Sequence, residues 1–336
     1  MTTPTRPHAV ALDLAGVREV LAMHLPVGPA RLVVVAMSRD ENPKAVVLAI
    51  PYGHDTPAVA AKVALTPTAA EAVRAEAAAL NQLAALDPGR VGGTVPRCLG
   101  LHDTPAATVL VTTVAVGRPM TVGYHSWRHT GRQRLVTADF AAADQWLGRL
   151  SSITVPAGAE SDLGERIAAR WPHDDVAQLA AEACRRARRQ VGPLRSGGVA
   201  HGDFWCGNLL SSKGAVSGVI DWEHARFGQP GLWDRVRFAL AYTLYLDRHH
   251  RAGTPVLGHP GLTAGTWGEP VRHLLRSSGW YSGVVASFIG SSSGAPNGTP
   301  GWWRSALLVG LGEIAALSDH DEFAREHAHL LAEVGS

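Results

Sequence analysis

Residues 201–223 hold a polar loop followed by two short apolar runs that meet at a glycine turn. The loop reads HGDFWCGN, and the two runs flank Lys213–Gly214. Because an antiparallel hairpin brings its open ends together, Asn208 and Asp221 are expected to converge there, with Asp203 close by. An amide oxygen and a carboxylate in this arrangement suit a hard cation such as Mg²⁺. A second carboxylate beside them can accept a proton from an alcohol.

The spacing of these residues resembles the catalytic machinery of the kinase superfamily. His201, Asp203 and Asn208 match the H-x-D-x-x-x-x-N catalytic loop, and Asp221 falls where protein kinases have Asp-Phe-Gly. Gly202 stands where protein kinases have arginine, which is similar to the aminoglycoside phosphotransferase and choline kinase branch. That branch phosphorylates small molecules.

The resemblance covers roughly residues 30–240 and implies a bilobal α+β fold of the protein-kinase-like type. An antiparallel sheet would form the N-terminal lobe, and the C-terminal lobe would be mostly helical. We place the boundary near Gly117. Residues 1–117 are then the nucleotide-binding lobe with its hinge strand, and residues 118–336 are the helical lobe with the catalytic loop and the substrate site.

Hydrophobic periodicity agrees with this division. A first helix is expected after Pro67, with Thr68 and Glu71 as a capping box. Residues 252–301 are rich in Gly, Pro and Ser and are expected to be a loop-rich insertion. Strands are predicted at residues 31–37, 45–50, 59–65 and 109–116, and helices at residues 138–150, 176–191 and 304–317.

The resemblance also implies a lysine on the third strand that binds phosphates and is paired with a glutamate on the next helix. Lys62, in a V-A-A-K run, is one of only three lysines in the chain. Glu76 shares a helical stripe with apolar residues, where an unpaired carboxylate would be costly. Ala60 lies on the same strand face as Lys62 and leaves room for a purine ring. Each residue alone has a plainer explanation, as an edge-strand lysine or a flanking glutamate.

Two further segments are assigned through the resemblance. Backbone groups of Thr113, Val114 and Val116 would bind the adenine edge at the interlobe hinge, although a plain core strand fits equally. The loop at residues 38–44 lacks the expected glycines. Ser38 or Arg39 would then contact the phosphates, or the loop would act as a lid.

The roles expected around the catalytic loop follow from the same match. Asp203 accepts or orients the proton of the acceptor hydroxyl, and His201 orients the loop. Asn208 and Asp221 hold Mg²⁺. Candidates for substrate contact are Glu223, Asp234 and Trp205, of which Asp234 is expected mainly to brace the loop.

Composition excludes several classes of partner. The formal net charge of +2 provides no basic face for nucleic acid. The sequence contains no run of 18 apolar residues, so no membrane span is predicted. The three cysteines form no CxxC pair, which argues against a disulfide framework or a zinc site. We therefore expect a cytoplasmic protein, monomeric or homodimeric, whose only required partner is a small molecule with a hydroxyl group.

These observations predict an ATP-dependent small-molecule kinase with Mg²⁺ as cofactor, and GTP as an alternative donor. The favoured acceptor is an antibiotic of the aminoglycoside or nucleoside type, phosphorylated for resistance or self-protection. One alternative is a metabolic kinase for a sugar, a choline-like compound or a cell-envelope alcohol. An alternative of another class is a nucleotide-binding pseudokinase.

Overall fold

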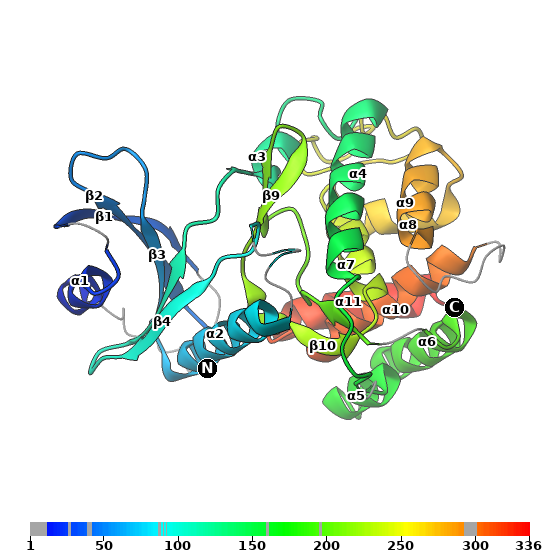
Figure 1. Ribbon diagram of the computed structural model, residues 1–336. Coiled ribbons are helices and arrows are strands. Elements are labelled where there is room, and N and C mark those ends of the chain that lie inside the picture. Colours follow the sequence, from blue (N-terminus) through cyan, green and yellow to red (C-terminus); the bar gives the residue numbers. More distant parts are fainter. Residues whose placement is uncertain are drawn as a thin grey trace, which may run out of the picture. The chain divides into compact units, whose positions relative to one another are not determined.

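The computed structural model describes the chain except residues 1–11, 26–27, 39–41, 87–88, 90, 92, 159–160, 195–196 and 292–300. The chain forms two compact units (Figure 1). The first contains residues 1–88 and 95–115, and the second contains residues 89–94 and 116–336. Each unit is described on its own below.

The first unit is built on a five-stranded antiparallel sheet with the order β1-β2-β3-β5-β4. Helix α1 packs against β3 and β5, and α2 packs against β3, β4 and β5 (Figure 1). Side chains alternate between the faces of a strand, and the odd-numbered residues of β3 form the core with α1. Lys62 and Ala60 therefore share the opposite face. The elements of this unit are α1 (Leu14–Ala22), β1 (Ala30–Met37), β2 (Lys44–Pro51), β3 (Val59–Ala64), α2 (Pro67–Leu86), β4 (Cys98–Asp103) and β5 (Thr108–Thr113).

Helix α1 and strand β4 were not predicted from the sequence. Asp13 caps α1, because its Oδ1 accepts hydrogen bonds from the backbone N–H groups of Ala15 and Gly16, both at 3.1 Å. Val17, Val20 and Leu21 of this helix are buried in the core of the first unit. The helix thus covers one face of the sheet.

The start of α2 differs from the predicted capping box. The helix begins at Pro67, and Thr66 caps it, because the Thr66 Oγ1 accepts from the Ala69 N–H at 3.2 Å. Thr68 lies inside the first turn. Proline fits the first helical position because it lacks an N–H that would find no partner there. Pro67 therefore starts the helix rather than ending the strand before it.

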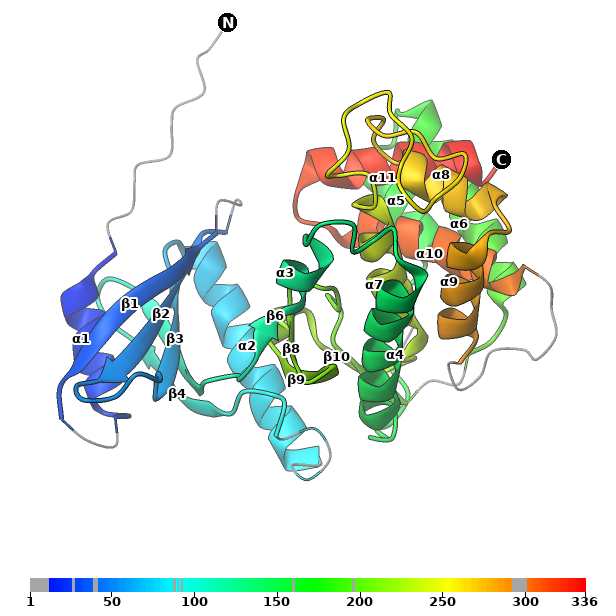
Figure 2. The ribbon, with the colours of Figure 1, turned by 90° about the horizontal axis from the view of Figure 1, so that it is seen from above.

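The second unit is mostly helical and carries two small antiparallel sheets, β6-β8-β9 and β7-β10. Figure 2 shows α4, α7 and α9 beside one another. Helix α10 is apolar around much of its surface and contacts α5, α6, α7, α9 and α11, so it forms the centre of the helical layer. The elements are β6 (Arg118–Pro119), α3 (Met120–Tyr124), α4 (Gln133–Leu150), α5 (Leu163–Arg170), α6 (Asp175–Val191), β7 (Gly198–Ala200), β8 (Leu209–Ser212), β9 (Ala215–Val219), η1 (Trp222–His224), β10 (Arg226–Gln229), α7 (Leu232–Leu244), α8 (Glu269–Arg276), α9 (Trp280–Gly290), α10 (Trp302–Leu317) and α11 (Asp321–Val334).

The hairpin predicted at residues 208–221 is present as β8 and β9. Its turn residues Lys213 and Gly214 have φ angles of 51° and 80°. Two successive positive φ angles are typical of the type I′ turn, whose twist matches that of the strands. The predicted loop-rich insertion at residues 252–301 is wrong in part, because α8 and α9 lie within it. Residues 292–300 of that segment lie outside the described residues, and no helix in the described part of the chain is long and apolar enough to cross a membrane.

His327 on α11 is completely buried in the second unit. Its Nδ1–H donates to the Phe323 carbonyl at 2.7 Å, and within the described residues its Nε2 has no hydrogen-bond partner. The rings of Phe323 and Trp267 pack against it. Burial lowers the pKa of His327 to about 4; the hydrogen bond to Phe323 partly offsets this shift, and the nearby Arg237 charge adds a smaller lowering.

This burial predicts an acid-sensitive fold. The folded-state pKa lies below the unfolded value of 6.5, so the unfolded chain binds the extra proton first as the pH falls. Stability is therefore lost from about pH 6.5 downwards, by on the order of 2 kcal/mol at pH 5. The melting temperature of His327→Leu should fall less between pH 7 and pH 5 than that of the wild type. The matched control is the exposed His173→Leu, and equal pH sensitivity of all three proteins would refute the assignment.

Candidate active site

The backbone of the catalytic loop is held by one buried carboxylate. Asp234, at the start of α7, is fully buried, and its two oxygens accept from the N–H groups of His201 (2.7 Å) and Gly202 (2.9 Å). Burial raises the pKa of Asp234, and these two hydrogen bonds act against that rise. With both oxygens on the loop, Asp234 braces it from behind. This position agrees with the bracing role expected from the sequence, and contact of Asp234 with a substrate stays a prediction.

The ring of His201 connects the loop to the end of β9. The Asp203 N–H donates to His201 Nδ1 at 3.2 Å, so the ring proton is on Nε2. Nε2 then donates to the Ile220 carbonyl at 2.9 Å. The ring also packs edge-on against Trp222, which is itself buried. His201 thus fixes the spacing between Asp203 and the residue before Asp221.

Gly202 is required by a close approach. Its φ is +82°, and a Cβ at this position would lie 2.1 Å from the His224 carbonyl oxygen. Any other side chain would therefore push the loop away from the segment after β9. This explains why glycine stands here between the histidine and the aspartate.

Asp203 has partners on both carboxylate oxygens. Oδ1 accepts from Arg237 Nη2 at 2.7 Å and from Nε at 3.1 Å, and Oδ2 accepts from Asn208 Nδ2 at 2.9 Å. Burial raises the pKa of Asp203, but the Arg237 charge and hydrogen bonds outweigh it and hold that pKa below its usual range. Asp203 is therefore an ionised, oriented acceptor at neutral pH.

Asn208 and Asp221 flank the open end of the hairpin, as predicted. Asn208 Nδ2 donates to two oxygens of Asp203, which only accept, so the amide orientation is set and its Oδ1 remains for a cation. Asp221 adopts a left-handed backbone with φ 73° and ψ 58°. Residues held in such sparsely populated backbone regions cluster at active sites.

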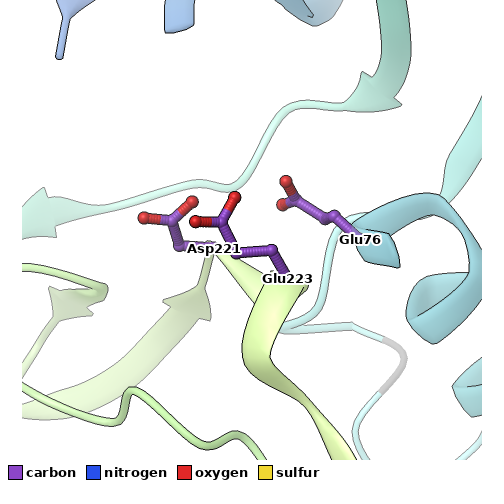
Figure 3. A group of neighbouring side chains, drawn as sticks. All are labelled: Glu76, Asp221 and Glu223. Atoms are coloured by element: carbon purple, nitrogen blue, oxygen red, sulfur yellow. The ribbon is translucent and has the colours of Figure 1, made fainter. Parts of the chain in front are cut away.

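Glu223 lies beside Asp221 in the turn that follows β9. Strand β9 ends at Val219, and Trp222–His224 forms a 3-10 turn, so strand alternation does not apply. The turn still brings ligand oxygens of Asp221 and Glu223 within 4.8 Å of one another. Figure 3 shows both carboxylates pointing to the same side of this segment. Two carboxylates and the Asn208 amide oxygen are the donor types that Mg²⁺ prefers.

Trp205 lines a cavity of about 180 Å³ that opens beside Asp203. The other walls come from α7, α10 and α11 and the residue after α7. Of the three candidates for substrate contact, Trp205 is the one that lines this cavity. Its remaining lining residues are Arg237, Ala241, Leu244, Tyr245, Ile314 and Phe323.

In the first unit, the predicted lysine and glutamate are in contact. Lys62 Nζ donates to Glu76 Oε2, and both side chains are largely buried. Glu76 projects from α2 (Figure 3). Ala60 lies two residues before Lys62 on β3 and shares its face. A buried carboxylate thus fixes the ammonium at one position on the sheet.

The segment assigned to the hinge is shorter as a strand than predicted. Strand β5 ends at Thr113, whose N–H donates to the Arg97 carbonyl at 3.0 Å. That N–H is therefore not available to a ligand, and Val114 follows outside the strand. The Val116 carbonyl accepts from Ser217 Oγ at 2.7 Å, within the second unit.

The two ends of the glycine-free loop, Ser38 and Lys44, are hydrogen-bonded to each other. Ser38 N–H donates to the Lys44 carbonyl at 2.9 Å, and Ser38 Oγ accepts from the Lys44 N–H at 2.8 Å. Ser38 thus closes the β1–β2 connection through its backbone and its side chain. Arg39, the other proposed phosphate contact, lies outside the described residues.

Arg237 is the site residue that the sequence motifs did not reveal. It lies on α7, three residues after Asp234, and reaches back to Asp203. Arg237 is one of three charged residues on a helix that is otherwise mostly apolar, and this was the available signal. Recognising its partner requires the tertiary structure, because 34 residues separate the two.

Comparisons with known proteins agree with this geometry. A model of the phosphotransferase enzyme family matches residues 52–232, more than half of the chain. Aminoglycoside phosphotransferase APH(3'')-Id from Streptomyces rimosus is structurally similar, with 15% identity and a TM-score of 0.52 over 96% of this chain and 99% of that one. The structure of that protein with ADP and streptomycin gives 14% identity and the same TM-score and coverage.

An aminoglycoside-3'-phosphotransferase of type VIII has 16% identity and a TM-score of 0.50, over 85% of this chain and 96% of that one. At these identities the similarity shows the protein-kinase-like fold. A comparison of the sequence with curated proteins gave no match.

The close approach at Gly202 can be tested against a matched glycine. Gly214 has nearly the same φ, +80°, but nothing lies within 4 Å of a Cβ there. Gly214→Ala should cost only the backbone strain, about 1 kcal/mol, whereas Gly202→Ala should cost several kcal/mol or displace the loop. Urea unfolding and phosphotransferase assays measure both effects. Equal losses in the two variants would show that the His224 contact is unimportant.

Proposed function

Because the chain belongs to the phosphotransferase enzyme family, we propose that it is an ATP-dependent O-phosphotransferase acting on a hydroxyl group of a small molecule. The observation that carries this proposal is the state of Asp203. It is ionised, held by Arg237 and Asn208, and exposed to a cavity large enough for part of an acceptor. A fixed carboxylate at a cavity mouth is what transfer to an alcohol requires.

In the proposed reaction, the acceptor oxygen forms a bond to the γ-phosphorus while the bond to the ADP oxygen breaks. The hydroxyl proton passes to a carboxylate oxygen of Asp203. Because Asp234 and His201 fix the loop backbone, Asp203 needs little reorganisation when the acceptor arrives. Most of the rate would come from this positioning and from charge neutralisation.

The residues around the hairpin fit a magnesium site. Asn208 and Asp221 would supply the ligands, with Glu223 as a further carboxylate. When bound there, Mg²⁺ neutralises charge on the phosphate oxygens. All of these candidate ligand atoms are oxygens, which excludes metals that prefer sulfur ligands.

In the first unit, the Lys62–Glu76 pair would bind the α- and β-phosphates. Glu76 holds the ammonium in place, and Ala60 leaves space for the base. ATP is the proposed donor, with GTP as the alternative. Backbone groups around Val114 would contact the base edge, with the Thr113 N–H excluded by its bond to Arg97.

We favour an antibiotic as the acceptor. The support is the fold shared with antibiotic-modifying enzymes, one of which has been solved with ADP and streptomycin. A cytoplasmic location would supply the ATP. The direct experiment is to measure ADP release without an acceptor and then with a panel of antibiotics and sugars, and to weigh the product by mass spectrometry. A mass gain of one phosphoryl group supports the proposal, and ADP release that no compound stimulates contradicts it.

Asp203→Ala tests the role of the carboxylate. Loss of a general base typically lowers turnover by roughly 10²–10⁴-fold, whereas ATP binding should be little changed, because Lys62 is untouched. Steady-state kinetics and calorimetric titration with ATP measure the two quantities. Asp203→Asn, which keeps the Asn208 and Arg237 contacts in part, controls for loss of shape. Turnover near that of the wild type in Asp203→Ala would sink the assignment.

Lys62→Arg tests the phosphate contact. A compact ammonium makes a point contact that a planar guanidinium does not reproduce, and the buried Glu76 partner leaves little room for the larger group. We expect a higher KM for ATP or a markedly lower kcat, with an unchanged KM for the acceptor. Lys213→Arg, in the exposed hairpin turn, is the matched control and should behave as the wild type. If both variants keep wild-type kinetics, Lys62 does not bind phosphate.

A further inference from the structure

The cavity beside Asp203 is lined almost entirely by apolar groups. Aromatic rings contribute from three separate segments: Trp205 from the catalytic loop, Tyr245 from the end of α7, and Phe323 from α11. Ala241, Leu244 and Ile314 complete the wall. The volume of about 180 Å³ exceeds that of engineered apolar cavities of about 150 Å³ that take up benzene. There is room for one ring of an acceptor.

The charges in this cavity cancel. Its lining contains two ionised groups, Asp203 and Arg237, and they form a two-point ion pair through a single carboxylate oxygen. The second oxygen of Asp203 is engaged by Asn208. His327, which lies close enough to feel the Arg237 charge, is buried and adds no charge at neutral pH. A cation that enters here meets a neutralised carboxylate and a guanidinium.

We infer that Arg237 determines acceptor specificity, so that this enzyme phosphorylates uncharged hydroxyl compounds with an apolar ring and discriminates against polycations. The inference rests on the proposed function and names the acceptor class of the same site. The ring enters between Trp205, Tyr245 and Phe323, and the hydroxyl group lies at Asp203. Arg237 cancels the attraction that the Asp203 carboxylate would have for an ammonium group, and at the same time it orients that carboxylate.

The test compares acceptors that differ in a single feature. Benzyl β-glucoside and benzyl 2-amino-2-deoxy-β-glucoside differ by one ammonium group, and glucose lacks the apolar ring. Streptomycin and kanamycin represent polycations. We expect kcat/KM to be highest for benzyl β-glucoside, and roughly ten- to hundredfold lower for its amino analogue, because the ammonium group loses hydration in a cavity whose charges cancel.

Arg237→Met then removes the charge while keeping an unbranched, flexible stem at this position. This variant is expected to lower kcat for every acceptor, because Asp203 loses an orienting contact. The decisive quantity is the ratio of kcat/KM between the neutral and the amino glucoside, which should fall about tenfold or more. Arg237→Lys keeps the charge and should restore most of the ratio. If the role of Arg237 were merely structural, kcat/KM would fall equally for the neutral and the amino glucoside, and their ratio would not change.

Arg325→Met is the matched control. Arg325 also forms an ion pair, with Asp174, but lies outside the cavity lining. The ratio of kcat/KM between the neutral and the amino glucoside should be the same in Arg325→Met as in the wild type. Melting temperatures identify variants that fail to fold, and the wild-type panel decides the acceptor class without any variant.

Calorimetric binding of the same compounds separates this inference from the proposed function. Preferential binding of benzyl β-glucoside without phosphorylation would uphold the acceptor class and contradict the transfer reaction. Phosphorylation with a preference for streptomycin, kanamycin or the amino glucoside would uphold the transfer and overturn the inference. A ratio unchanged in Arg237→Met, or no binding of benzyl β-glucoside, would also overturn it.

Discussion

The buried Asp234 carboxylate organises the catalytic half of this protein. It accepts the N–H groups of His201 and Gly202, two successive residues of the loop, from the first turn of a helix. A buried carboxylate without such partners would be strongly destabilising, so the loop and α7 stabilise one another. The His201 ring extends the arrangement to the end of β9. The position of Asp203 therefore depends on the packing of α7, whereas Asn208 and Asp221 are placed by the β8–β9 hairpin.

The same helix also controls the charge at the site. Asp234 and Arg237 both project from α7, the first to the backbone of the loop and the second to the side chain of Asp203. A third charged residue, Arg235, pairs instead with Asp144 on α4. One helix thus binds the loop backbone, neutralises the charge of Asp203 and forms an ion pair with α4. Small shifts of α7 would change all three properties together.

Sequence spacing predicted the parts of the fold that depend on a few chemically unusual residues. The hairpin, the Lys62–Glu76 contact and the protein-kinase-like fold follow from such residues. Helix α9 was missed because its sequence, rich in glycine and β-branched residues, has low helix propensity, and its buried Val285, Phe288 and Ile289 hold it in place through packing. The cap at Thr66 was missed because Thr68 fits the same local pattern. Arg237 was missed because its partner is distant in sequence.

The left-handed backbone of Asp221 limits which residues can replace it during evolution. Asparagine and glycine tolerate that conformation, whereas most other residues pay for it in folding energy. Asparagine would keep the shape but remove the negative charge, and glycine would remove both the charge and the ligand atoms. Most other substitutions of Asp221 would destabilise the fold. Selection would therefore act on them through the loss of stability as well as through any loss of activity. Reversion from asparagine or from glycine would therefore restore the carboxylate at this position without any change of the backbone conformation.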